Sequence, residues 1–133
     1  MKVLFVCIKN SARSVIAEAV FNSLAKKWRA ESAGIQKGDK IDEKVREILE
    51  KEGLKAKELP RSVEEVNLND YELVVTVCDE ISCINLPAKN VLRWYIEDPA
   101  GKSYEAYKEV FNKIKKKVEE LVDELENQKI QKN

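Results

Sequence analysis

The sequence contains no histidine, and this absence removes several classes of enzyme chemistry at once. Without imidazole the chain cannot form a Ser-His-Asp triad or a Cys-His catalytic pair. The common zinc sites are excluded as well, because only three cysteines and the carboxylates remain as ligands. If the chain is an enzyme, we expect its acid to be a carboxyl group and its nucleophile to be a thiolate that is activated without imidazole.

The chain also lacks an excess of charge and any long hydrophobic segment. Its 24 basic and 24 acidic residues balance, so no net charge draws it to nucleic acid or to an anionic membrane. The apolar runs at 3–8 and 73–78 are far shorter than the ~20 residues of a membrane span. Polar residues follow the first run at once, which argues against a signal peptide. We therefore expect a cytoplasmic protein with no nucleic-acid partner and no membrane partner.

Cysteine is scarce, and its odd number argues against a structural disulfide framework. The three cysteines are Cys7, Cys78 and Cys83, and thiols normally stay reduced in the cytoplasm. The length of 133 residues and a hydrophobic content of 44% suit one domain with one core. We expect that domain to span residues 1–127 and a polar tail to follow at 128–133.

Hydrophobic periodicity divides the chain into alternating strands and helices. Short apolar runs predict strands at 3–6, 29–33, 73–77 and 91–95. Apolar residues at helical spacing predict helices at 14–24, 42–52 and 104–125. This alternation is typical of an α/β domain with a parallel sheet, whose ligands bind at the carboxyl ends of the strands. Cys7, Cys78 and Asp98 follow or end three of these strands, so we expect them at one edge of the sheet.

An eight-residue motif with the pattern C-x5-R-S lies between the first predicted strand and the first predicted helix. Its residues are Cys7, Ile8, Lys9, Asn10, Ser11, Ala12, Arg13 and Ser14. A loop of this length can turn its backbone N–H groups inward, and the helix N-terminus adds partial positive charge. Arg13 can bind two oxyanion oxygens with its planar guanidinium, and the positive field favours the thiolate of Cys7. Ser14 can donate a hydrogen bond to that sulfur, and asparagine at position 10 tolerates a left-handed backbone.

Each candidate residue also has an ordinary structural explanation. C-x5-R occurs often by chance, as a buried cysteine beside a surface arginine, but its position between a strand and an amphipathic helix favours an anion-binding loop. Asp98-Pro99 is a common turn sequence, and only the Cys7 loop favours Asp98 as the acid that protonates a leaving oxygen. Cys78 and Cys83 flank a four-residue segment and can be two incidental thiols, because free cysteine is often buried.

Several motifs considered together resemble one known superfamily. They lie, in order along the chain, at 6–18, 32–35, 60–62, 74–78 and 98–102. The pattern is similar to that of the low-molecular-weight tyrosine phosphatases and, among them, of the arsenate reductases that recycle through thioredoxin. The resemblance implies an α/β fold: a single three-layer domain in which a four-stranded parallel sheet has helices on both faces.

The resemblance also implies roles for the candidate residues. In such reductases Cys7 would attack arsenate or a phosphate-like oxyanion held by Arg13 and the loop, and Asp98 would be the general acid. Cys78 and Cys83 would relay a redox-active disulfide that thioredoxin or an equivalent dithiol protein reduces. We then expect a monomer with no cofactor that serves arsenical resistance.

Some positions depart from the pattern of the resembled family. Lys9 stands where relatives usually have Gly, Ala12 stands where they often have Cys, and the Cys78–Cys83 spacing is slightly short. Some relatives bind potassium with residues that match Asn10, Glu18 and Ser32. A further acidic ligand of theirs corresponds to Val63 here, so we expect no metal.

Two other functions stay open at this point. A phosphatase acting on phosphotyrosine or small phosphomonoesters would need only Cys7, Arg13 and Asp98. Phosphatase relatives usually carry an aromatic residue after the Asp-Pro pair, whereas Ala100 and Gly101 follow here, which favours the reductase. A non-catalytic domain that binds oxyanions or senses redox state is the second alternative, and the presence of Asp98 argues against it.

Overall fold

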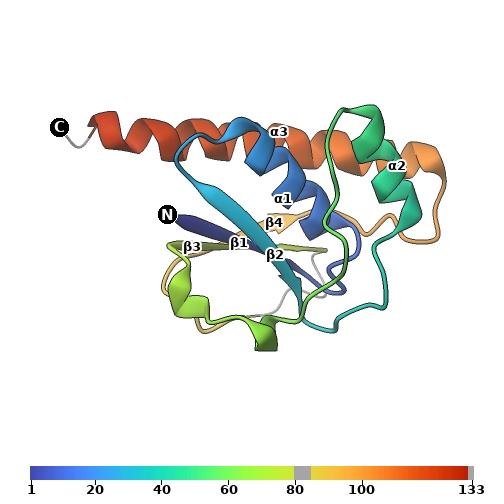
Figure 1. The fold of residues 1–133 in the computed structure, drawn as a ribbon, viewed down its shortest axis with the longest axis horizontal. Coiled ribbons are helices and arrows are strands. Elements are labelled where there is room, and N and C mark those ends of the chain that lie inside the picture. Colours follow the sequence, from blue (N-terminus) through green and yellow to red (C-terminus); the bar gives the residue numbers. More distant parts are fainter. Residues whose placement is uncertain (80–84, 132–133) are drawn as a thin grey trace.

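Four parallel strands form one sheet in the order β2-β1-β3-β4, as a computed structural model of the chain shows (Figure 1). The structure describes residues 1–79 and 85–131, with side chains described through residue 127. The strands are β1 (Lys2–Cys7), β2 (Arg29–Gly34), β3 (Leu73–Cys78) and β4 (Val91–Tyr95). The helices are α1 (Arg13–Leu24), α2 (Glu43–Lys51) and α3 (Tyr104–Gln131), with two 3₁₀ turns, η1 (Val63–Glu65) and η2 (Leu68–Asp70). The predicted α/β fold with a parallel sheet is confirmed.

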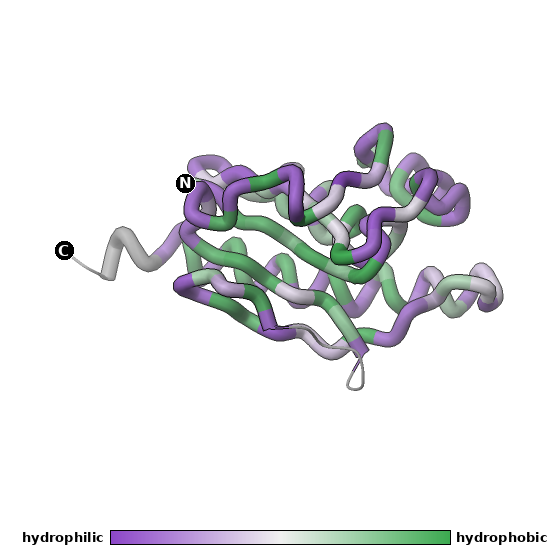
Figure 2. Tube along the Cα trace, turned by 90° about the horizontal axis from the view of Figure 1, so that it is seen from below, coloured by the Kyte–Doolittle hydropathy of each residue, from purple (hydrophilic) through white to green (hydrophobic). Residues whose placement is uncertain are grey.

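Alternation of side chains along the central strands produces two hydrophobic clusters, one on each face of the sheet. The larger cluster joins Val3 and Phe5 to the apolar stripes of the three α-helices, which all lie over that face in Figure 1. The smaller cluster joins Leu4 and Val6 to the segment that contains η1 and η2. Figure 2 shows the same organisation, with hydrophobic residues along the strands and hydrophilic residues in the surrounding turns. Both faces are therefore covered, by α-helices on one side and by 3₁₀ turns and loops on the other.

Two local features set the start and the end of α2 where the sequence predicts them. Asp42 is its N-cap and accepts a hydrogen bond from the Lys44 backbone N–H at 2.9 Å. Gly53 has a φ of 74°, the left-handed conformation that glycine adopts most easily after a helix. Ser62, which precedes η1, caps that turn as Asp42 caps α2, because its hydroxyl accepts a backbone N–H of the turn.

Helix α3 is longer than the apolar stripe predicts. The stripe stops at Leu125, yet the helix continues to Gln131, into the segment expected to be a polar tail. Glu126 accepts hydrogen bonds from the backbone N–H groups of Lys26 and Lys27 at 3.0 and 3.1 Å, so the helix still contacts the body of the protein one residue beyond the stripe. Within residues 1–79 and 85–131, no helix is both long and apolar enough to cross a bilayer.

Candidate active site

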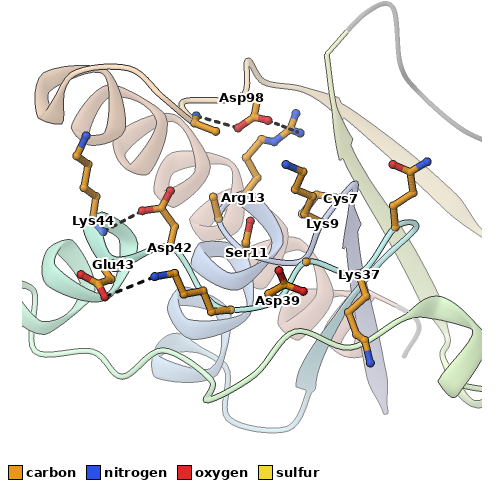
Figure 3. Close-up of a pocket in the computed structure, with 15 residues that line it drawn as sticks. Cys7, Lys9, Ser11, Arg13, Lys37, Asp39, Asp42, Glu43, Lys44 and Asp98 are labelled. Atoms are coloured by element: carbon orange, nitrogen blue, oxygen red, sulfur yellow. Dashed lines mark hydrogen bonds and ion pairs between the residues drawn. The ribbon is translucent and has the colours of Figure 1, made fainter.

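The carboxyl edge of the sheet holds a pocket of about 1030 Å³ that is lined by Cys7, Arg13 and Asp98 (Figure 3). Cys7 is the last residue of β1, Arg13 is the first of α1, and Asp98 follows β4. Three segments that are far apart in the sequence meet here because all the strands are parallel and end at this edge.

The loop between Cys7 and Arg13 is held with its carbonyl groups turned outward. Four of its carbonyl oxygens accept hydrogen bonds from backbone N–H groups of the segment 35–42: Cys7 from Ile35 at 3.1 Å, Ile8 from Gln36 at 2.8 Å, Lys9 from Gly38 at 3.0 Å and Ser11 from Asp42 at 3.0 Å. The C=O and the following N–H of a trans peptide point in opposite directions, so the N–H groups that follow these carbonyls face the inside of the loop. No side chain caps the N-terminus of α1, and no acidic residue lies in its first turn. These N–H groups can therefore bind an anion.

Gly34 allows β2 to approach this loop closely. A Cβ at this position would lie 2.7 Å from the carbonyl carbon of Lys9 and 2.8 Å from the backbone nitrogen of Asn10. Both are backbone atoms that cannot rotate away, so any larger residue would displace the loop. The close approach explains why the strand ends in glycine next to the anion-binding loop.

Arg13 is fixed by contacts on the inner side of the pocket. Its side chain is nearly fully buried, and Nη1 donates to the carbonyl oxygen of Ile96 at 3.0 Å. Nη2 lies 3.8 Å from Oδ2 of Asp98, whose Oδ1 accepts from the Ala100 backbone N–H at 3.0 Å. The half-exposed Asp98 carboxyl group is thus oriented across the mouth of the pocket, opposite the guanidinium.

A buried hydrogen-bond chain supports the thiol of Cys7, a free cysteine. Its Sγ lies 2.9 Å from Oγ of Ser14, and that hydroxyl accepts from Nδ2 of Asn10 at 2.8 Å. Asn10 has a φ of 56°, the left-handed conformation anticipated at this position. Ser14 and Asn10 are both 0% exposed, so water does not compete for these bonds.

Cys78 lies near Cys7, at the end of the strand that pairs with β1. It is buried, and both cysteines line one small cavity with five mainly apolar neighbours: Val6, Ile8, Ile35, Thr76 and Val77. Cys83, the predicted partner of Cys78 in the redox relay, lies outside the described residues. The structure thus brings two of the three cysteines to one place at the edge of the sheet.

Some residues of the site escape sequence analysis. Asp42 is recognisable as the start of a helix, but its support of the loop, through the N–H that binds Ser11, is not. The carboxylate of Asp42 also accepts from the hydroxyl of Tyr107, and burial and this carboxylate raise the Tyr107 pKa. Lys57, which contacts the back of the loop, sits in a run of charged residues that gives no sign of a role.

Lysines surround the mouth of the pocket, and most of them are paired. Lys37 pairs with Glu65, Lys40 pairs with Glu43, and Lys44 donates to a backbone carbonyl. Lys9, which lies beside Cys7 in Figure 3, extends from the loop itself. In the part of the chain that the structure describes, no group of three or more acidic or cysteine side chains is arranged to hold a metal ion.

The family match, the similar sequences and the similar solved structures all indicate the same family. Residues 2–132 match the family of low molecular weight phosphotyrosine protein phosphatases. The crystal structure of an arsenate reductase from Archaeoglobus fulgidus has 56% sequence identity and a TM-score of 0.89, covering 91% of this chain and 98% of that one. A structure described as an arsenate reductase in the phosphate binding state has 30% identity and a TM-score of 0.84, covering 92% and 97%. The glutaredoxin arsenate reductase of Synechocystis sp. is 32% identical over 129 residues, which cover 91% of this chain and 95% of that protein.

Proposed function

Because the chain belongs to the low molecular weight phosphotyrosine protein phosphatase family, we propose that it reduces arsenate to arsenite by a thiol–disulfide relay that starts at Cys7. The relatives named as arsenate reductases support the overall reaction. The observation that carries the relay is that Cys7 and Cys78 end neighbouring strands and line one cavity. Such a relay requires a reducing compartment, which is consistent with the cytoplasm.

In the first step, arsenate binds to the inward N–H groups of the loop and to Arg13. The Cys7 thiolate forms a bond to arsenic while an arsenic–oxygen bond breaks. Asp98 gives its proton to the departing oxygen, which leaves as water. The loop and Arg13 stabilise the charge that develops on the remaining oxygens, because their positions are fixed before the reaction.

In the second step, the Cys78 thiolate attacks Sγ of Cys7. The electron pair of the sulfur–arsenic bond stays on arsenic, which leaves as arsenite, and a Cys7–Cys78 disulfide forms. The two thiols thus supply the two electrons that reduce As(V) to As(III). Cys83 then attacks Cys78, which releases Cys7 as a thiolate and forms a Cys78–Cys83 disulfide.

A dithiol protein must finally reduce that disulfide and restore the thiols. We assign this step to thioredoxin or an equivalent protein. The name of the Synechocystis relative makes glutaredoxin the alternative, so both reductants belong in the test.

Phosphomonoester hydrolysis is the second candidate function, and the family match favours it. It would use Cys7, Arg13 and Asp98 in the same way, with water resolving a phospho-cysteine intermediate. It would need neither Cys78 nor Cys83.

One paired assay distinguishes the two functions. Arsenate-dependent NADPH consumption is measured with complete thioredoxin and glutaredoxin systems, beside p-nitrophenyl phosphate hydrolysis by the same preparation. We expect turnover of arsenate with at least one reductant, and Cys7→Ser should abolish both activities because a neutral hydroxyl cannot replace the thiolate. Phosphate-ester hydrolysis with no arsenate turnover under either reductant would make the chain a phosphatase.

A further inference from the structure

A lysine ammonium lies behind the Cys7 loop, on the side away from the pocket. Lys57 belongs to the segment between α2 and η1, and its Nζ donates to Oδ1 of Asn10 at 2.8 Å. It also donates to the backbone oxygen of Ser32 at 2.9 Å and to the hydroxyl of Ser32 at 3.3 Å. Three acceptors match the three hydrogens of an ammonium, so this lysine is held in place rather than lying along the surface.

The surroundings of Lys57 combine burial with opposite charge. Glu18, on α1, accepts a hydrogen bond from the hydroxyl of Ser32, and its pKa is raised chiefly by burial. Burial lowers the pKa of Lys57, and the negative charge of Glu18 opposes that change. The charged groups that act on Lys57 are Glu18, Arg61, Cys7 and Glu31. A partly buried cation among these groups interacts more strongly with its neighbours than an exposed lysine would.

The hydrogen bonds of Asn10 transmit this arrangement to the nucleophile. Oδ1 of Asn10 accepts from Lys57 and from the Arg61 backbone N–H at 2.9 Å, which fixes the oxygen side of the amide toward the cation. The amide nitrogen must then face the hydroxyls of Ser14 and Ser32, at 2.8 and 2.9 Å. The Ser14 hydroxyl accepts from Asn10 and keeps its own hydrogen, which it can donate to Sγ of Cys7, 2.9 Å away. A sulfur that receives a hydrogen bond is favoured as a thiolate.

We propose that the Lys57 ammonium is a tethered cation that orients Asn10 and Ser14 and thereby keeps Cys7 as the reactive thiolate. The inference rests on the proposed function in one respect, the role of Cys7 as nucleophile. Lys57 acts through Asn10 and Ser14, so it is a positioning residue and not a catalytic one.

The test is the pH dependence of Cys7 alkylation in the reduced, full-length protein. Iodoacetamide is added between pH 5 and pH 9, and peptide mass spectrometry quantifies modification at Cys7 separately from the other cysteines. Lys57→Gln keeps a hydrogen-bond donor and removes the charge, while Lys57→Ala leaves a space for an added cation. Lys55→Gln is the matched control, because Lys55 is exposed and only two residues away.

At pH 6 we expect Lys57→Gln and Lys57→Ala to alkylate about tenfold more slowly than the native protein. A roughly tenfold smaller fraction of thiolate, the change that one pH unit produces, would cause this difference. At pH 9 the rates should converge, because the thiol then ionises without help. Methylammonium chloride should restore part of the pH 6 rate in Lys57→Ala, and the bulkier tetramethylammonium chloride should not. Lys55→Gln should behave as the native protein does.

A native alkylation rate at pH 6 in folded Lys57→Gln would overturn the proposal, as would an equal loss of rate at pH 6 and pH 9, which indicates altered access to the thiol. If Lys57→Ala does not fold, Lys57→Gln alone decides. No arsenate is present in this measurement. A chain that does not reduce arsenate but shows the expected alkylation profile would therefore contradict the proposed function and leave the role of Lys57 intact.

Discussion

At the scale of single residues, the proposed mechanism assigns oxyanion binding and proton transfer to two different side chains. Arg13 is buried and anchored to the carbonyl of Ile96, so little side-chain entropy is lost when it binds an anion. Asp98 is attached to the following turn through the Ala100 N–H and remains half exposed. In the proposed mechanism Arg13 is therefore the fixed anchor for the anion, and Asp98 is the proton donor that solvent can reach.

The separation of these roles predicts the effect of Asp98→Asn. The loop and Arg13 remain, so the affinity for inorganic phosphate, measured as competitive inhibition, should change little. The general acid is lost, and kcat should fall by about 10²–10⁴. Stopped-flow measurement of the first turnover isolates the chemical step, and an unchanged rate there would mean that another group donates the proton.

Sequence analysis can locate candidate residues that lie together in one local motif along the chain. Cys7, Arg13 and Ser14 belong to one motif between a strand and a helix, and the left-handed Asn10 follows from the same motif. Lys57 cannot be found in this way. Its partners Asn10 and Ser32 are 47 and 25 residues away, and only the folded chain brings them together.

At the scale of elements, the anion-binding loop depends on β2 and on the segment that follows it. We expect Gly34→Ala to displace the loop, because the new Cβ would lie within 2.8 Å of its backbone. Overpacking of this kind costs about 1–3 kcal/mol of stability, and phosphate affinity should fall as the N–H groups move. Thermal unfolding and phosphate inhibition measure the two effects.

Gly38→Ala provides the control for this substitution. Its Cβ would lie 3.5 Å from the nearest atom, which belongs to the side chain of Lys9, and this is an ordinary contact. Gly38 also lines the same pocket. If both variants lose affinity equally, the close approach of β2 is not what shapes the loop.

A second contact between elements links stability to pH. Glu31, on β2, accepts hydrogen bonds from Tyr71 and Arg61 at 2.6 and 2.9 Å. Burial alone would raise the Glu31 pKa, but the hydrogen bonds from Tyr71, Arg61 and Lys2 outweigh it and lower the pKa from 4.5 to about 2. A lowered folded-state pKa contributes stability above pH 4.5, and that contribution is lost as the pH falls from 4.5 to about 2.

Tyr71→Phe should therefore be destabilising at neutral pH and much less so in acid. We expect a loss of about 1 kcal/mol at pH 7, since the carboxylate is partly exposed and solvent screens the bond. The difference from the native protein should shrink toward zero at pH 2. Urea unfolding at both pH values measures it, with the exposed Tyr95→Phe as control. A difference that is equal at pH 7 and pH 2 would assign the effect of Tyr71 to packing.

Helix α3 shows what periodicity reveals about an element and what it misses. The apolar stripe predicts the buried part, up to Leu125, because burial is what the 3.6-residue period records. The helix continues to Gln131, beyond the last position that the apolar period marks. A period of buried residues thus gives a lower bound for the length of a helix.

At the scale of the whole molecule, the parallel sheet decides which chemistry is available. β1, β3 and β4 all end at one edge, so Cys7, Cys78 and Asp98 converge there from distant parts of the chain. A phosphatase needs only the first and the last of these. Arsenate reduction needs two electrons as well, and only thiols in this chain can supply them.

Substitution of each relay cysteine should separate the two activities. Cys78→Ser should stop arsenate turnover, because it removes the thiol that lines one cavity with Cys7. It should spare p-nitrophenyl phosphate hydrolysis, which needs no second thiol. Cys83→Ser should allow the Cys7–Cys78 disulfide to form but prevent its transfer outward, so the protein should stall after one round. The hydrolysis assay on the same preparations is the control for folding and for the integrity of the pocket.

Mass spectrometry after a single turnover identifies the intermediate directly. In the native protein we expect Cys78 bonded to Cys83, and in Cys83→Ser we expect Cys78 bonded to Cys7. If both serine variants reduce arsenate at the native rate with a dithiol protein present, the internal relay is wrong. An external thiol would then attack Sγ of Cys7 and complete the two-electron reduction, with the electron pair of the sulfur–arsenic bond left on arsenic. The cavity shared by Cys7 and Cys78 would be a consequence of packing at the sheet edge rather than a path for disulfide exchange.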